Sequence, residues 1–132
     1  IGDDSMTTTE MQGAVALENY RDRHIEIDYT TRSLRVDSVP VTLTRKEFAL
    51  LAALASNAGE IMRRDVLLSR IWGYGPMIRT RTLDVHIRRL RKKLGVHGDS
   101  YIETIFGVGY RFQPAHGYRA PLLTMGAMQA IA

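Results

Sequence analysis

The residues between Thr80 and Leu94 have the types and the spacing to bind a polyanion. In a helix, which turns by about 100° per residue, one narrow side of this stretch would be wholly apolar. That side comprises Leu83, Ile87, Leu90 and Leu94. The opposite side would present Arg81, Thr82, Val85, Arg88, Arg89 and Lys92. A narrow apolar seam backed by a broad basic face is typical of a helix that rests on its own protein and presents cations to phosphates.

Two of these side chains suggest duplex DNA as the polyanion. Val85 is apolar near the centre of the basic face, where solvent gives it no favourable contact and a thymine methyl in the major groove would. Arg89 lies one turn further along and has the forked guanidinium that pairs with guanine O6 and N7. The ordinary alternative is a basic face that meets only solvent, as most charged helix faces do.

The basic charge of the chain is concentrated in its centre. Over 132 residues the net charge is only +4. Residues 61–93, however, hold 10 basic and 2 acidic side chains, whereas residues 1–60 hold 6 basic and 10 acidic ones. The average therefore hides a cationic segment that overlaps the proposed DNA-binding helix.

The segments on either side supply the elements that must position this helix. Residues 24–43 alternate apolar and polar side chains, which predicts a small antiparallel sheet. Within it, Pro40 has no N–H to donate and predicts an edge strand. A further strand pair is expected over residues 101–112, with its hairpin tip at Phe106–Gly109.

Two more helices are expected before the basic one. The first follows Thr44, which with Glu47 forms a capping-box pair, and it should end at Gly59. The second spans about residues 64–72, and a short loop joins it to the helix at 80–94. Two helices joined in this way form a helix-turn-helix, and the terminal hairpin makes it a winged helix.

Several motifs in this order resemble one known family. The run from Arg81 to Leu94, followed by Ile-Phe-Gly-Val-Gly-Tyr-Arg-Phe at 105–112, resembles the DNA-binding effector domain of OmpR/PhoB-type response regulators. Leu-Thr-Arg-Lys-Glu-Phe-Ala-Leu-Leu at 43–51 and Ile-Trp-Gly at 71–73 match the same family in order and spacing. The resemblance covers about residues 24–113. It implies an α+β winged helix-turn-helix with a four-stranded N-terminal sheet, three helices and a C-terminal β-hairpin wing.

The resemblance also implies roles for individual residues. Base edges in the major groove would be contacted by Thr82, Val85 and Arg89. Phosphates would be contacted by Trp72, Arg81, His86, Arg88, Arg91, Thr104 and Tyr110. RNA polymerase would be contacted by a loop over residues 73–79 that includes Gly73, Tyr74, Gly75 and Pro76. The expected partners are promoter DNA with repeated half-sites, RNA polymerase and a second protomer on the DNA.

The sequence departs from the family pattern at three points. Phe106 stands at the wing tip, where the family usually has an arginine that enters the minor groove, and a phenylalanine cannot supply that charge. Arg63 stands where a Ser or Thr N-cap is expected. The family's phosphate-receiving domain has no counterpart here, and we expect either an excised effector domain or a stand-alone one.

Other kinds of site find no support in the sequence. The chain has no cysteine, which excludes disulfides and thiolate chemistry. Its four histidines are scattered, and no two have metal-ligand spacing on one element, so neither a metal nor a cofactor is expected. No P-loop and no Gly-x-Ser-x-Gly elbow is present, and no enzymatic activity is expected. No apolar run could span a bilayer, and a cytoplasmic protein is the default expectation.

The expected domain organisation has three parts. Residues 1–23 are interpreted as a leader, of which 1–5 have the character of an expression scar. Residues 24–113 form the winged helix, and residues 114–132 form an extension that could be vector-derived, an added helix or a dimer contact. The predicted function is a sequence-specific DNA-binding transcription regulator. The alternative from another class is a winged helix that docks on a protein partner and has lost DNA binding.

Overall fold

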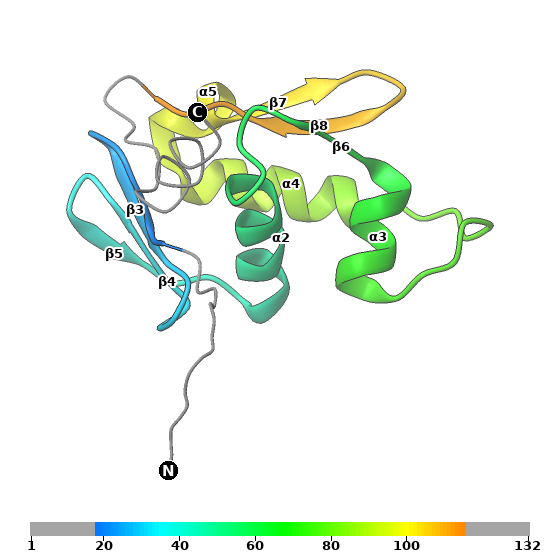
Figure 1. The fold of residues 1–132 in the computed structure, drawn as a ribbon, viewed down its shortest axis with the longest axis horizontal. Helices are drawn as coiled ribbons and strands as arrows, with labels where there is room; N and C mark the ends of the chain where they lie inside the picture. Colours follow the sequence, from blue (N-terminus) through cyan, green and yellow to red (C-terminus); the bar gives the residue numbers. More distant parts are fainter. Residues whose placement is uncertain (1–17, 116–132) are drawn as a thin grey trace, which may run out of the picture. The chain divides into compact units, whose positions relative to one another are not determined.

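The structure is a computed structural model that describes residues 18–115. The expectations for residues 1–17 and 116–132, including most of the C-terminal extension, therefore lie outside the described part of the chain. In chain order the elements are β2 (Tyr20–Arg21), β3 (Ile25–Asp28), β4 (Ser33–Val36), β5 (Val39–Val41), α2 (Arg45–Ala55), β6 (Ile61–Arg63), α3 (Arg64–Trp72), α4 (Thr82–Lys93), the 3₁₀ helix η2 (Gly95–His97), α5 (Gly98–Tyr101), β7 (Ile102–Ile105) and β8 (Gly109–Phe112). Figure 1 shows the first sheet on one side of α2 and α3 on the other.

The first sheet is antiparallel and has the strand order β2-β3-β4-β5. Leu34 on β4 pairs with Ile27 on β3 and with Val41 on β5, which puts apolar side chains in neighbouring positions. Pro40 lies on β5 at the edge of the sheet, as its missing N–H predicted. Strand β2 begins before residue 24, so the folded part starts earlier than the sequence indicated.

An aspartate next to β2 explains why this early segment is ordered. The Asp22 carboxylate accepts hydrogen bonds from the backbone N–H groups of His24 and Ile25, at 2.8 and 3.0 Å. It also accepts hydrogen bonds from the hydroxyls of Tyr20 and Tyr101. These bonds tie the first sheet to α5, which is distant in the sequence. A local sequence pattern cannot reveal these bonds, because Asp22 and Tyr101 are far apart in the sequence.

Helix α2 begins as its capping box predicted. Thr44 Oγ1 accepts a hydrogen bond from the Glu47 N–H at 3.1 Å, and Glu47 Oε1 accepts one from the Thr44 N–H at 2.9 Å. Glu47 is only 2% exposed and also pairs with Lys93 at 2.6 Å. Burial alone would raise the pKa of Glu47, but the bonds from Lys93 and Thr44 lower it below its ordinary value. This pair joins the start of α2 to the end of α4.

The predicted end of α2 was wrong. The helix ends at Ala55 rather than at Gly59, and Ser56 is its C-cap. The Asn57 side chain donates to the Ala53 carbonyl at 2.8 Å. A side-chain bond of this kind competes with continued helix, so the chain turns before it reaches the glycine.

The wing is a three-stranded sheet rather than a simple hairpin. Its order is β6-β8-β7, and Met62 on β6 pairs with Tyr110 on β8. Strand β6 is too short to show a periodicity, and the sequence did not predict it. Gly109 lies opposite Arg63, where a Cβ atom would come within 2.0 Å of the Met62 carbonyl oxygen. A glycine is required there for the two strands to pair.

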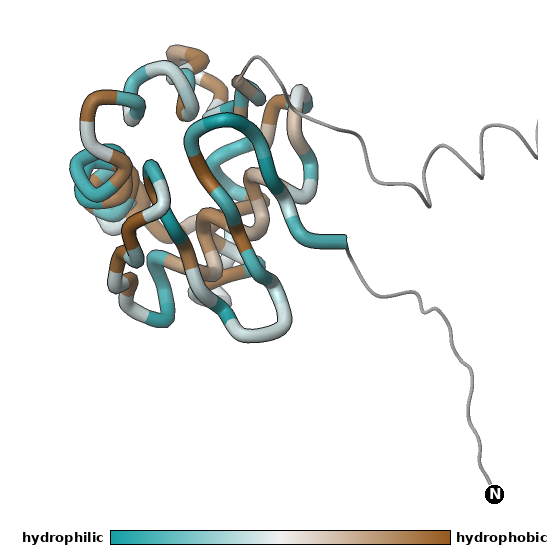
Figure 2. The backbone as a smooth tube through the Cα atoms, turned by 90° about the vertical axis from the view of Figure 1, so that its left-hand side faces the viewer, coloured by the Kyte–Doolittle hydropathy of each residue, from teal (hydrophilic) through white to brown (hydrophobic). Residues whose placement is uncertain are grey.

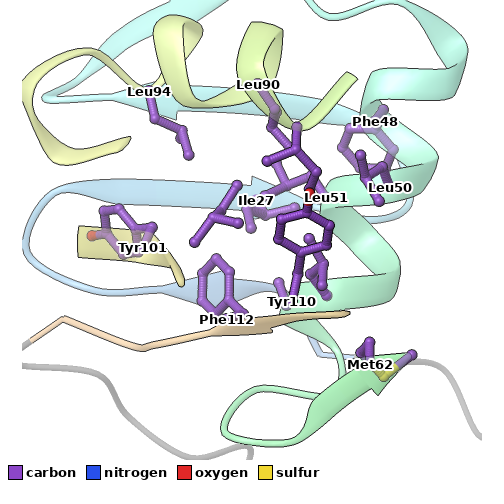
Figure 3. Packing of buried hydrophobic residues seen from close by; sticks show 14 of the residues in the cluster. Ile27, Phe48, Leu50, Leu51, Met62, Leu90, Leu94, Tyr101, Tyr110 and Phe112 are labelled. Carbon is purple, nitrogen blue, oxygen red and sulfur yellow. The ribbon is translucent and has the colours of Figure 1, made fainter. Parts of the chain in front are cut away.

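One hydrophobic core lies between the first sheet, the helices and the wing. Figure 3 shows Ile27 of β3, Leu90 and Leu94 at the end of α4, Tyr101 of α5 and Phe112 of β8 converging in this core. All five side chains are at most 1% exposed. Coloured by hydropathy, the chain is brown mainly toward the inside and teal or white in its outer turns (Figure 2). The core therefore holds α4 firmly by one side.

The fold class is the predicted winged helix, with short additions besides strand β6. The 3₁₀ helix η2 and the single turn α5 lie between α4 and the wing and were not expected. Among the described residues, no helix is both long and apolar enough to cross a membrane.

Candidate nucleic-acid interface

Helix α4 has the two faces that its sequence predicted. Leu83, Ile87, Leu90 and the C-cap residue Leu94 are each at most 1% exposed, so the apolar seam lies in the core. On the other side, the exposed residues are Arg81, Arg88, Arg89 and Lys92, and the half-buried ones are Thr82, Val85 and His86. The helix runs Thr82–Lys93 instead of 80–94. The Thr80 hydroxyl accepts a hydrogen bond from the Thr82 N–H at 3.1 Å just before the helix, whereas the N-cap residue Arg81 makes no side-chain capping bond.

The side chains of α4 divide into paired and unpaired cations. Lys93 pairs with the buried Glu47, and Arg91 makes three hydrogen bonds within the protein. Within residues 18–115, the side chains of Arg88, Arg89 and Lys92 make no hydrogen bond or ion pair. Cations next to the core thus hold the fold together, whereas those on the far face are left for solvent or a ligand.

Arg91 was expected to contact phosphate, and the structure places it against the wing. Its guanidinium donates to the Ile102 carbonyl at 3.1 and 2.6 Å and to Thr104 Oγ1 at 2.7 Å. It also lies 5.9 Å from the centre of the Tyr110 ring. These contacts bring Arg91, Thr104 and Tyr110 of the expected phosphate set together, and they fix β7 against α4.

A partly buried hydrogen-bond network sets the position of α4 relative to α3 and the wing. Asp84 Oδ1 accepts hydrogen bonds from Arg64 and from the Tyr110 hydroxyl, both at 2.5 Å. Partial burial would raise the pKa of Asp84, but these two donors lower it below its ordinary value. Burial and the bond to Asp84 raise the pKa of Tyr110 to about 12. No local sequence pattern reveals this network, because its members come from three elements.

His86 and Trp72, both expected at phosphates, lie together where α3 meets α4. Their ring centroids are 4.9 Å apart, with the planes at 74°, and His86 Nδ1 lies 2.8 Å from the Thr82 carbonyl oxygen. Lys46 Nζ donates to the Ile71 carbonyl at 2.7 Å and lies 5.9 Å from the centre of the Trp72 ring. Lys46 is an exposed cation that the sequence reasoning missed. Only its contact with the Trp72 ring in the folded structure marks Lys46 as part of this surface, because the two residues are far apart in the sequence.

The wing tip and the loop between α3 and α4 expose apolar side chains. Phe106 is 89% exposed at the tip, so it has no packing role in the described protein. The loop contains the expected polymerase-contact residues, of which Gly73, Gly75 and Pro76 are exposed and Tyr74 is half-buried. Beyond them, Met77 is 88% exposed and was not singled out from the sequence.

An open groove runs beside the start of α4. It is lined in part by Arg64, Arg79 and Arg81, with Asp84 on its wall. Since Arg64 is already bonded to Asp84, Arg79 and Arg81 are the cations here that remain for an anion. The groove widens the basic surface beyond the helix itself.

Comparison with known proteins identifies the family. The sequence profile described as "Transcriptional regulatory protein, C terminal" matches residues 38–112, which is more than half of the chain. The chain belongs to this family. Its members are transcription regulators, not a class of enzymes.

Individual members of the family are clearly similar. The transcriptional regulatory protein VxrB of Vibrio cholerae is 45% identical over 91 residues, which are 68% of this chain and 36% of VxrB. HprR of Escherichia coli is 47% identical over 89 residues, which are 67% of this chain and 40% of HprR. The chain thus spans well under half the length of these regulators.

A solved structure of the family gives the same fold. The DNA-binding domain of RstA from Klebsiella pneumoniae, crystallised in complex with the RstA box, superposes with a TM-score of 0.68 at 34% identity. The match covers 75% of this chain and all of the RstA domain. The winged-helix arrangement described above is therefore that of the family.

Proposed function

We propose that this chain is a sequence-specific, double-stranded DNA-binding regulator of transcription, the effector part of a response regulator. One observation carries the proposal: the cations on the far face of α4 are unpaired, while those beside the core are paired. Helix α4 would enter the major groove with Arg89, Val85 and Thr82 toward the base edges. The RstA complex with its box supports this for a domain of the same fold.

Phosphate contacts would fix the register of the protein on the duplex. Arg81 and Arg88 are exposed on the far face of α4, and His86 lies against Trp72 where α3 meets α4. Arg91 donates a hydrogen bond to Thr104, and Tyr110 donates one to Asp84. Arg91, Thr104 and Tyr110 would act mainly by presenting the helix and the wing, with phosphate contacts only from their remaining donors.

The assembly on DNA and the polymerase contact are further parts of the proposal. We infer binding as tandem protomers, each on one half-site, that associate with one another on the DNA. The loop that contains Gly73 and Tyr74 would face RNA polymerase. Its exposed Met77, together with Ile78 at 51% exposure, supports a protein contact there.

Selection of bound duplexes from a random pool tests this function. We expect enrichment of a repeated motif whose half-sites lie about one helical turn, 10–10.5 base pairs, apart. Equal affinity for every duplex would refute sequence-specific binding. It would favour the alternative of a protein-docking winged helix, for which the exposed Phe106 is the best evidence.

A further inference from the structure

Two histidines and an aspartate, none of them among the proposed DNA contacts, meet where η2 approaches the first sheet. In this histidine–aspartate cluster, His97 Nε2 lies 3.0 Å from Asp37 Oδ2, and His24 Nδ1 lies 3.5 Å from Asp37 Oδ1. One ligand atom from each of the three residues lies within 4.8 Å of the other two. The sequence did not predict the cluster, because its members come from three segments.

The strand register fixes two members of the cluster. Ile25 on β3 pairs with Val36 on β4, so His24 and Asp37 are the next residues opposite each other. The Asp37 N–H donates to the His24 carbonyl at 2.7 Å. Asp37 and Ser38 both have positive φ, 49° and 70°, as in a two-residue hairpin turn that matches the strand twist. The backbone therefore holds these two side chains together whether or not the third is present.

The end of α4 brings the third member. His97 is the last residue of η2, directly after α4, and its ring stacks on that of His24 with centroids 4.0 Å apart and planes at 23°. The next residue, Gly98, lies against the backbone of Arg91, where a Cβ atom would come within 2.2 Å of the carbonyl oxygen. This close approach, which only glycine allows, folds η2 back toward the sheet.

The donor set suits a divalent transition metal. Two imidazole nitrogens and one carboxylate oxygen, with a fourth position open to water, are a common ligand set for zinc. Zinc–ligand bonds of about 2.0–2.2 Å put two ligands of one ion at most about 4.4 Å apart. The ligand atoms here span up to 4.8 Å, so small shifts would close the site. The stacked rings must also turn until both nitrogens face the ion.

The side chains are accessible enough for such a movement. The exposed fractions are 35% for His24, 18% for His97 and 56% for Asp37. A site of this kind sits at the surface yet joins two parts of the fold.

We propose that His24, Asp37 and His97 bind one divalent metal ion of the zinc type, which links the first sheet to the end of helix α4. None of the three residues belongs to the proposed DNA interface, so the site is independent of that function. Binding to the folded state alone stabilises it by mass action, and the ion also fixes the segment that follows α4.

Titration of the full, EDTA-treated chain with zinc chloride tests the proposal. We expect saturation at one ion per chain and a rise in Tm with zinc concentration. Magnesium chloride should cause neither effect, because Mg²⁺ prefers an all-oxygen octahedral site. A wild-type titration without saturation, or with several weak sites only, would overturn the proposal.

Matched variants locate the site. His97→Gln and Asp37→Asn should each weaken zinc binding by more than about tenfold. Replacing a residue that only supports a metal ligand already costs about tenfold or more in metal affinity, and these two residues are direct ligands in the proposal. His86→Gln removes one histidine outside the cluster and should leave zinc affinity unchanged. Tm values in EDTA show whether each variant is folded. If His97→Gln does not fold, the conservative Asp37→Asn variant still tests the site. Equal loss in all three variants, or no loss in the two cluster variants, would contradict the assignment.

Discussion

Removal of the Tyr110 hydroxyl should destabilise the fold through Asp84. In Tyr110→Phe the ring keeps its place in the core, and only the 2.5 Å hydrogen bond to Asp84 Oδ1 is lost. A hydrogen bond to a charged group contributes about 1.5–3 kcal/mol. Because the Asp84 side chain is 42% exposed and keeps Arg64, the expected loss is smaller, about 1–2 kcal/mol of the free energy of unfolding at pH 7.

Urea denaturation at pH 7 measures this loss, and melting gives an independent value. For a domain of about 100 residues, 1–2 kcal/mol corresponds to a fall in Tm of about 4–16 °C. Tyr74→Phe is the matched control, because the Tyr74 hydroxyl has no hydrogen bond within the described part of the chain. The control should cost less than about 0.5 kcal/mol.

A double-mutant cycle with Asp84→Asn assigns the effect to the network. If Tyr110 acts through Asp84, the two substitutions are coupled by about 1 kcal/mol instead of being additive. A loss no larger than that of Tyr74→Phe, or strict additivity with Asp84→Asn, would refute the reasoning. In that case the short contact contributes nothing to stability.

Three further predictions concern the DNA contacts and the response to acid. Arg89→Ala should cost about 1–3 kcal/mol of binding free energy on the selected duplex and relax the preference at one base pair. Arg88→Ala should weaken the binding of all duplexes alike. If both variants lose affinity uniformly for all duplexes, Arg89 does not read a base. Phe106→Arg should strengthen binding to duplexes with A·T-rich flanks, measured against G·C-rich ones, and no gain would place Phe106 outside the groove. Although burial raises the pKa of Asp22, the tyrosine hydroxyls lower it below 3.8 in the folded state. Its contribution is therefore complete above that pH and lost as the pH falls through the folded value. Asp22→Asn should thus lower the urea midpoint at pH 7 and flatten its fall below about pH 4, and parallel pH curves would contradict this.

Local patterns predicted the elements that depend on local physics. The capping box of Thr44 and Glu47 and the apolar seam of α4 are set by residues close together on one helix, and the edge position of Pro40 is set by its own missing N–H. All three were confirmed. The basic face of α4 followed from the same periodicity, since residues opposite a buried seam must be exposed.

Long-range contacts account for what the sequence did not reveal. Strand β6 exists because β8 pairs with it, and β2 is held by the bonds that Asp22 makes to α5. The role of Arg91 depends on Ile102 and Thr104, which lie on β7 and are separated from α4 by η2 and α5. A helical projection shows which way Arg91 points but not which carbonyl it meets.

The histidine–aspartate cluster is a case of the same kind. A search for ligand spacing on one element finds nothing, because His24 and Asp37 are neighbours only through the strand register. His97 joins them from the other end of the domain. Sites assembled from three segments become visible only once the fold is known.

The salt dependence of DNA affinity tests the central claim most directly. Affinity for a selected duplex, measured by fluorescence anisotropy between about 50 and 200 mM salt, reports how many phosphates the protein neutralises. About five phosphate contacts predict a slope of log K against log salt of about −4 to −5. Replacement of the unpaired Arg88 by alanine should reduce that slope by about one. A flat salt response would contradict the account, because the unpaired cations of α4 would then not be meeting phosphates.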